Sequence, residues 1–98
     1  MIAIVWRYRV RPESVTQFES AYGRAGAWAK LFAACAGYVD TELLRDVDGS
    51  YLTIDRWQRQ HDFDRFHAQH REAYAALDAV CDFWTLEETR LGVFETLA

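Results

Sequence analysis

Residues 2–10, IAIVWRYRV, alternate between two sets of side chains along their whole length. The first set is Ile2, Ile4, Trp6, Tyr8 and Val10, and the second is Ala3, Val5, Arg7 and Arg9. Alternation with a period of two is typical of a β-strand, because successive side chains point to opposite faces of a sheet. The first set predicts a buried face, and Ala3 and Val5 make the other face partly apolar as well.

The segment after this strand has helical patterns. Pro12 ends the strand, and the spacing of Ser14 and Gln17 matches a capping box, so a helix is expected to begin here. Glycines interrupt this helix, and the helical pattern resumes in AWAKLFAACAGY, where Gly37 is placed as a left-handed C-terminal cap. The sequence therefore predicts one helical region, bent or broken near Gly23.

The remaining elements complete a mixed α+β order. Residues 38–46 and 50–57 are strand-like, and Asp48-Gly49 between them predicts a hairpin with a type I′ turn. Apolar residues then recur at helical spacing from Asp62 to about Val80, and RLGVFETL supplies a last strand. The predicted order of elements is therefore strand, helix, strand, strand, helix, strand. This is the order of a ferredoxin-like βαββαβ sandwich, expected here as one domain over residues 1–98.

A sheet with helices on one face leaves its other face uncovered. The apolar residues expected on that face, such as Ala3 and Val5, favour a second subunit as the cover. We therefore expect a homodimer joined through its sheet faces, with Arg7 near the interface and engaged in a salt bridge.

Composition excludes several classes of protein. The formal charge is −4 and the arginines form no long basic stripe, so nucleic acid is not an expected partner. The apolar start MIAIVW is too short to span a membrane and lacks the charge order of a signal peptide, so a cytoplasmic protein without membrane contact is expected. Cys35 and Cys81 are far apart and match no zinc or disulfide pattern, and both are interpreted as small buried residues.

Four segments together resemble the antibiotic biosynthesis monooxygenase (ABM) family of the dimeric α/β-barrel superfamily. They are VRPESVTQFESAY, AGYVDTELLRD, YLTIDRW followed by Phe63, and LEETRLGVFE, and they span nearly the whole chain. The resemblance implies a dimeric α/β barrel. It also implies a choice of activities, because the family includes cofactor-free monooxygenases acting on polycyclic phenols, haem-degrading enzymes and members without an assigned activity.

The resemblance argues against haem. The haem-degrading branch carries an Asn on the first strand, a Trp early in the second helix and an axial His further on, and the matching positions here are Trp6, Phe66 and Ala76. A metal site is equally unsupported, because His67 and His70 lack the further ligands that would complete a set, and His61 is expected at a solvated helix start. We therefore expect no cofactor and no metal.

His70 is the candidate catalytic residue, because it falls in the apolar stripe between Phe66, Tyr74 and Leu77. It is either a core histidine or a base that deprotonates a phenolic ligand, with His67 as a half-exposed neighbour. Rings expected to wall a cleft for a small aromatic ligand, or else to fill the core, are Trp6, Tyr8, Phe18, Tyr22, Trp28, Phe32, Trp57, Phe66, Tyr74 and Trp84.

Two functions follow as hypotheses. The first is a cofactor-independent monooxygenase that oxidises a hydrophobic phenol-like or anthrone-like substrate between sheet and helices, where the protein binds the ring, removes a proton and excludes water. The second is a ligand-binding or structural dimer without catalysis. The sequence does not name the substrate.

Overall fold

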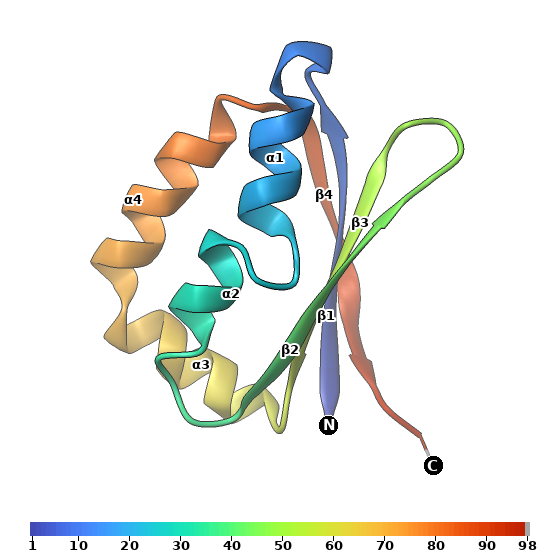
Figure 1. Cartoon of the computed structure of the whole chain (residues 1–98). Helices are drawn as coiled ribbons and strands as arrows, with labels where there is room; N and C mark the ends of the chain where they lie inside the picture. Colours follow the sequence, from blue (N-terminus) through green and yellow to red (C-terminus); the bar gives the residue numbers. More distant parts are fainter. Residues whose placement is uncertain (98) are drawn as a thin grey trace.

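The computed structural model describes residues 1–97, which form one antiparallel sheet covered by helices on one face (Figure 1). The strands are β1 (Ile2–Val10), β2 (Tyr38–Arg45), β3 (Tyr51–Trp57) and β4 (Thr85–Glu95). The helices are the short 3-10 turn η1 (Pro12–Ser14), α1 (Val15–Tyr22), α2 (Ala27–Phe32), α3 (Gln60–Gln69) and α4 (Arg71–Asp82). The strand order β2-β3-β1-β4, antiparallel throughout, confirms the predicted ferredoxin-like fold.

The hairpin between β2 and β3 is confirmed, but its predicted turn type is wrong. Within the described loop 46–50, Gly49 alone has a positive φ, of 89°, whereas a type I′ turn needs two such residues. The carboxylate of Asp48 instead accepts hydrogen bonds from the backbone N–H and the hydroxyl of Ser50, at 2.8 and 2.6 Å. Asp48 therefore stabilises the loop through its side chain, without adopting a left-handed backbone.

The long helix predicted over residues 62–80 is divided at His70. This residue has φ −117° and ψ 32°, so α3 ends at Gln69 and α4 begins at Arg71. No glycine or proline marks the break. Phe63 and Phe66 of α3 pack on Trp57, whereas Tyr74 of α4 packs on Trp28, so the two apolar stripes meet different parts of the core.

Three smaller expectations also need correction. Ser14 precedes α1 as predicted, but its side chain makes no capping hydrogen bond. The last strand starts at Thr85, earlier than its apolar pattern indicates. Cys81 is buried as expected, whereas Cys35 is only half-buried.

The inward face of β1 builds the core and positions the site. Tyr8 packs on Phe18 and Tyr22, with ring centroids 5.3 and 5.0 Å away, so the first strand is joined directly to α1. Further along the sheet, Trp57 and Phe66 are fully buried and their ring centroids lie 5.6 Å apart. Aromatic contacts therefore run continuously between sheet and helices.

Gly37 lies where the loop before β2 crosses the start of α3, in the left-handed conformation predicted for it, with φ 94°. A Cβ atom there would lie 2.3 Å from Cγ of Asp62, whose carboxylate accepts hydrogen bonds from Arg59 and Arg65. We expect Gly37→Ala to lower the free energy of unfolding by about 2 kcal/mol or more, because it combines φ strain with a clash. Urea denaturation measures this loss, and Gly49→Ala, strained in φ but with open space around it, should cost less.

Candidate functional site

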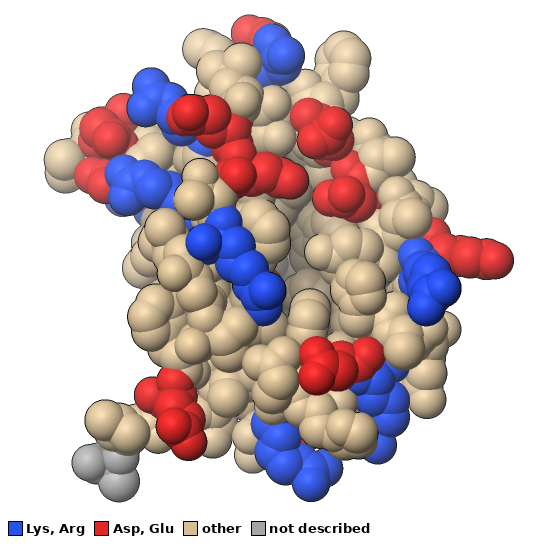
Figure 2. Space-filling model, turned by 180° about the vertical axis from the view of Figure 1, so that it is seen from behind, with Lys and Arg blue, Asp and Glu red and all other residues tan. Residues whose placement is uncertain are grey.

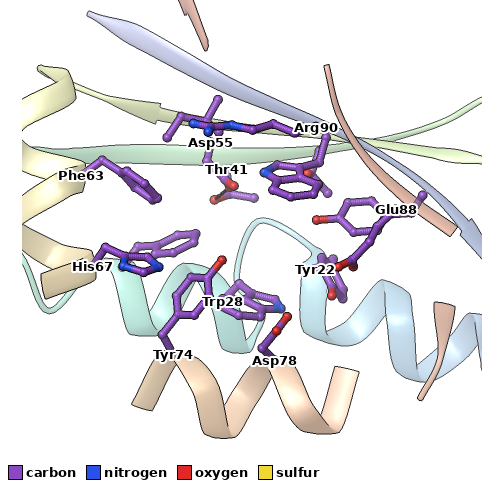
Figure 3. A pocket seen from close by; sticks show the side chains of 15 residues that line it. Tyr22, Trp28, Thr41, Asp55, Phe63, His67, Tyr74, Asp78, Glu88 and Arg90 are labelled. Carbon is purple, nitrogen blue, oxygen red and sulfur yellow. Dashed lines mark hydrogen bonds between the residues drawn. The ribbon is translucent and has the colours of Figure 1, made fainter. Parts of the chain in front are cut away.

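A cavity of about 220 Å³ lies between the inward face of the sheet and the four helices α1, α2, α3 and α4. Its lining residues are Ile4, Trp6, Tyr8, Tyr22, Trp28, Phe32, Thr41, Thr53, Asp55, Phe63, His67, Tyr74, Asp78, Glu88 and Arg90. In Figure 3, Trp28, Phe63 and Tyr74 surround the space, Thr41 and Asp55 approach it from the sheet, and Asp78 approaches it from α4. From behind, the surface is hollowed, with acidic and basic side chains around the hollow (Figure 2).

Six of the ten rings expected to wall a cleft do line this cavity. They are Trp6, Tyr8, Tyr22, Trp28, Phe32 and Tyr74. Phe18, Trp57 and Phe66 are fully buried in the core, and Trp84 packs against the core at its edge, so these four do not line the cavity. The sequence left open whether these rings fill the core or wall a cleft. In the structure, some of them wall the cavity and the others belong to the core.

His70 does not lie where the predicted helix would place it. It is half-buried at the junction of α3 and α4, where its ring stacks on Phe66 with the centroids 5.5 Å apart. It does not line the cavity, because the break in the helix moves it out of the inward-facing stripe. His67 lines the cavity instead, with its ring centroid 4.7 Å from that of Tyr74.

Asp55 is the titratable group that β3 presents to the cavity. Thr41 on the neighbouring strand donates a hydrogen bond of 2.7 Å from its hydroxyl to the Asp55 carboxylate. The Tyr38 hydroxyl lies 2.8 Å from the same Thr41 oxygen and must be the donor there, because Thr41 has one proton and gives it to Asp55. Burial raises the pKa of Asp55 to about 6, which suits a proton acceptor near neutral pH.

Several other polar groups face the same space. Burial raises the pKa values of the Tyr8 and Tyr22 hydroxyls above their ordinary value, so both stay protonated. Within residues 1–97, Trp28 Nε1 and Thr53 Oγ1 are buried at the cavity without a well-formed hydrogen bond, as Trp57 Nε1 is in the core, and the Tyr22 hydroxyl lies near Trp28 and the Tyr8 hydroxyl near Thr53. Because an unpaired buried polar atom is costly, these two atoms fit a site that supplies them with a partner from a ligand.

The open side of the cavity is charged. Asp78 comes from α4, and Glu88 and Arg90 come from β4, where they pair with Tyr8 and Trp6 of β1. Partial burial, with the charges of Asp78 and Asp82 nearby, raises the pKa of Glu88. The lining thus contains three carboxylates and one guanidinium.

Sequence reasoning missed most of these polar residues. Asp55 and Thr53 fall in the same alternate set of β3 as the buried Tyr51 and Trp57, so strict alternation contained a signal for them. Glu88 and Arg90 had no such signal. A register shift between Val5 and Trp6 in the pairing of β1 with β4 inserts one residue and changes which side chains of β4 face inward.

Within residues 1–97, no three His, Cys, Asp or Glu side chains gather as a metal-ligand set. No helix in the same range has the length and apolar character needed to cross a membrane.

Asp55 makes stability depend on pH. Its pKa of about 6 in the folded protein, against 3.8 as the ordinary value, means that folding favours its protonated form. The stability that protonated Asp55 gives the folded protein is present below pH 3.8 and is lost as the pH rises through 6. We expect Asp55→Asn, which stays neutral, to be more stable than the wild type by about 3 kcal/mol at pH 7.5, and to lose this advantage at pH 4.

Urea denaturation at both pH values measures this difference. Asp64→Asn is the control, because it also replaces one carboxylate by an amide but at an exposed position of α3, where Asp64 accepts a hydrogen bond from Gln60. An advantage of Asp55→Asn that is equal at both pH values would contradict the raised pKa.

The fold and cavity are those of a small α+β protein with a cavity lined by aromatic rings, and comparison with known proteins gives its family. Residues 1–77 match the family model described as antibiotic biosynthesis monooxygenase, so the chain belongs to that family. No curated protein sequence matches the chain.

Solved structures agree with this assignment. A variant of SnoaB, described as a cofactor-independent oxygenase from Streptomyces nogalater, is 26% identical and has a TM-score of 0.80, over 97% of this chain and 91% of that one. Another SnoaB structure, also 26% identical, has a TM-score of 0.77 over 99% and 93% of the two chains. A putative antibiotic biosynthesis monooxygenase from Nitrosomonas europaea, 10% identical, shares the fold, with a TM-score of 0.73 and full coverage of both chains.

Proposed function

We propose that this protein is a cofactor-independent monooxygenase that oxidises a hydrophobic aromatic substrate of the phenol or anthrone type. The observation that carries the proposal is a cavity with aromatic walls that contains a half-buried carboxylate, Asp55, with a pKa of about 6. The family and the similarity to SnoaB, itself described as a cofactor-independent oxygenase, support the same activity.

The chemistry requires little from the protein. Asp55 accepts the proton of the acidic C–H or O–H group, and the resulting electron-rich anion transfers one electron to O₂, giving a substrate radical and superoxide. These combine to form a C–O bond, and the peroxide loses water as its O–O bond breaks. For an anthrone, the ring CH₂ becomes C=O, one O₂ is consumed and one H₂O is released, so the substrate's own electrons reduce the second oxygen atom.

The site residues divide this work. Asp55 removes the proton, and Thr53 Oγ1, which has the Tyr8 hydroxyl beside it but no well-formed hydrogen bond, hydrogen-bonds the substrate oxygen. The rings of Trp6, Trp28 and Tyr74 bind the flat substrate and exclude water, which strengthens the electrostatic effect of nearby charges. This assignment replaces His70 with Asp55 as our proposed proton acceptor, because Asp55 lines the cavity.

The volume limits the substrate. An apolar cavity of roughly 150 Å³ accommodates benzene. At about 220 Å³, this cavity has room for a larger flat system of about two rings, and further rings would extend through the open side.

Oxygen consumption tests the proposal. Purified protein is incubated in air with naphthols, hydroquinones and anthrones of one to three rings, without added cofactor. We expect uptake of one O₂ per quinone formed from an anthrone, and no effect of a chelator. If no substrate raises uptake above that of heated protein, the monooxygenase proposal fails and the alternative of a ligand-binding protein without catalysis takes its place.

We also propose that the protein is a homodimer joined through the sheet face opposite the helices. Val5 and Ile54 pair across β1 and β3 on that face, where Leu44 and Phe94 remain 43% and 51% exposed. An apolar sheet face of this kind is usually covered by a partner. Arg7, on the same face, donates a hydrogen bond of 2.9 Å to Asp46, as the expected salt bridge requires.

Light scattering coupled to size-exclusion chromatography tests the dimer. The wild type should elute at twice the monomer mass, and Ile54→Asp should elute as a monomer, because it places a charge in the apolar interface. Val80→Asp, an equal change on the exposed side of α4, should leave the mass unchanged. A monomeric wild type would refute the proposed interface.

A further inference from the structure

We propose that the substrate of this site carries a cationic amine, which lies between Asp78 and Glu88 at the open side of the cavity while its hydroxyl-bearing ring lies inside. The inference rests on the proposed function and adds a charge requirement to it. It is carried by the charges of the lining, by two unpartnered polar atoms and by the arrangement of the rings.

The lining has an excess of negative charge that the protein does not balance. Asp78 and Glu88 form no ion pair with any residue in the described range 1–97, although Arg7, Arg56 and Arg65 elsewhere each pair with carboxylates. With Asp55 ionised, three carboxylates face one guanidinium, that of Arg90. An ammonium group would restore the balance.

The carboxylates of the lining also act on two tyrosine hydroxyls inside the cavity. Burial is the main cause of the raised pKa of Tyr8 and Tyr74, and the charges of Asp55 and Glu88 add to it for both hydroxyls. Because these carboxylates disfavour a negative charge on either tyrosine, they also disfavour an anionic ligand placed beside them.

The rings favour a cation for a separate reason. Aromatic faces attract ammonium groups, and Trp has the strongest attraction. Trp28 and Tyr74 lie with their ring centroids 5.1 Å apart, and Asp78 extends from α4 beside them in Figure 3. Rings and carboxylates together form a site with two independent attractions for the same charge.

The unpartnered atoms place the polar end of the ligand. Trp28 is 7% exposed and Thr53 is 2% exposed, and both line the cavity with a polar atom lacking a hydrogen-bond partner. Thr53 and Asp55 are adjacent inward positions of β3, so a ligand hydroxyl can meet both. Glu88 lies two strands away, beside Tyr8, and strand geometry puts its backbone about 16 Å from that of Asp55.

A cationic substrate also assists the proposed chemistry. Proton transfer to Asp55 neutralises this carboxylate and moves its negative charge onto the substrate ring, so the total charge of the cavity does not change. An ammonium group on the same molecule attracts the anion that forms on the ring, although it acts at a distance rather than by direct contact, because the backbones of Glu88 and Asp55 lie about 16 Å apart. The charges of the lining and the anion formed in the reaction therefore both favour a cationic substituent on the substrate.

Binding of three matched probes tests the inference. They are 5-hydroxytryptamine, 5-hydroxyindole and 5-hydroxyindole-3-acetate, which share one hydroxylated two-ring system and carry a positive, a zero and a negative charge. By calorimetry at pH 7.5 and low salt, we expect the amine to bind at least about tenfold more tightly than the carboxylate, with the neutral probe between them. Added salt should reduce this ratio.

Substitutions localise the effect. Asp78→Asn combined with Glu88→Gln should bring the affinity ratio close to one. Glu87→Gln, which removes a charge from the opposite face of the same strand, where Glu87 pairs with Arg9, should leave the ratio unchanged. Equal or tighter binding of the carboxylate, a preference that persists in the double variant, or no binding of the amine would each overturn the inference.

Failure of this inference differs from failure of the proposed function. If neutral naphthols or anthrones consume oxygen while the amine shows no preference, only the charge requirement is wrong. If the amine binds preferentially and no aromatic compound is oxidised, the cation site stands and the oxygenase proposal fails.

Discussion

Replacing Asp55 with asparagine is expected to reduce the rate of oxygen consumption by about 100-fold or more, because positioned proton transfer contributes roughly 10²- to 10⁴-fold to catalysis. Asparagine has nearly the same shape and keeps an oxygen that accepts the 2.7 Å hydrogen bond from Thr41. The loss would therefore report the missing negative charge rather than a distorted sheet. The measurement is kcat on the best substrate of the panel, determined in an oxygen electrode.

Two further variants make this result decisive. His70→Ala should retain most of the activity, because His70 lies outside the cavity, stacked on Phe66. The wild-type rate should fall as pH drops below about 6, the pKa of Asp55, because the protonated carboxyl no longer accepts a proton. If Asp55→Asn keeps the wild-type rate, the proton acceptor is another residue, and His67, which also lines the cavity, becomes the next to replace.

Phe66→Ala is expected to lower the free energy of unfolding by about 3–5 kcal/mol, the usual cost of deleting a fully buried ring. Phe66 contacts Phe32, Trp57 and Tyr74, so its removal opens a hole where α3 meets the sheet. Domains of this size have a total stability of roughly 5–15 kcal/mol, so the variant would be close to unfolding at room temperature. Urea denaturation followed by fluorescence measures the change.

Phe63→Ala is the matched comparison, because it deletes the same ring one helical turn away. Phe63 is half-buried and lines the cavity, so we expect a smaller loss of stability, about 1–2 kcal/mol, and weaker binding of a naphthol. Equal losses of stability in the two variants would show that the cavity wall is as tightly packed as the core.

The sequence determined the element order and the face of β1 that is buried. Strand alternation is a local property with a period of two, and Ile4 and Tyr8 are buried as that period predicts. Six of the predicted wall residues were found for the same reason, since large rings on inward faces lie either in the core or in a cavity within it. The hairpin was equally local, because the turn between β2 and β3 uses Asp48 and Gly49.

The tertiary structure alone decided which rings are core and which are wall. Trp57 and Phe66 are fully buried, whereas Trp6 and Phe63 face open space, and no pattern in the sequence separates the two pairs. The difference depends on how α3 and α4 diverge at His70, where packing of two apolar stripes on different partners breaks a continuous helical period. That break also moved His70 away from the cavity and left His67 on its wall.

The polar residues of the site depended on strand pairing. Asp55 has its raised pKa because the sheet and helices largely remove it from water, and this effect outweighs the hydrogen bond from Thr41 of β2, which lowers the pKa. Glu88 and Arg90 face inward because a register shift against β1 adds a residue to β4. Alternation along one strand decides which residues share a face. Pairing with the neighbouring strand decides whether that face points toward the helices or away from them. The charged residues of this cavity point inward because of that pairing.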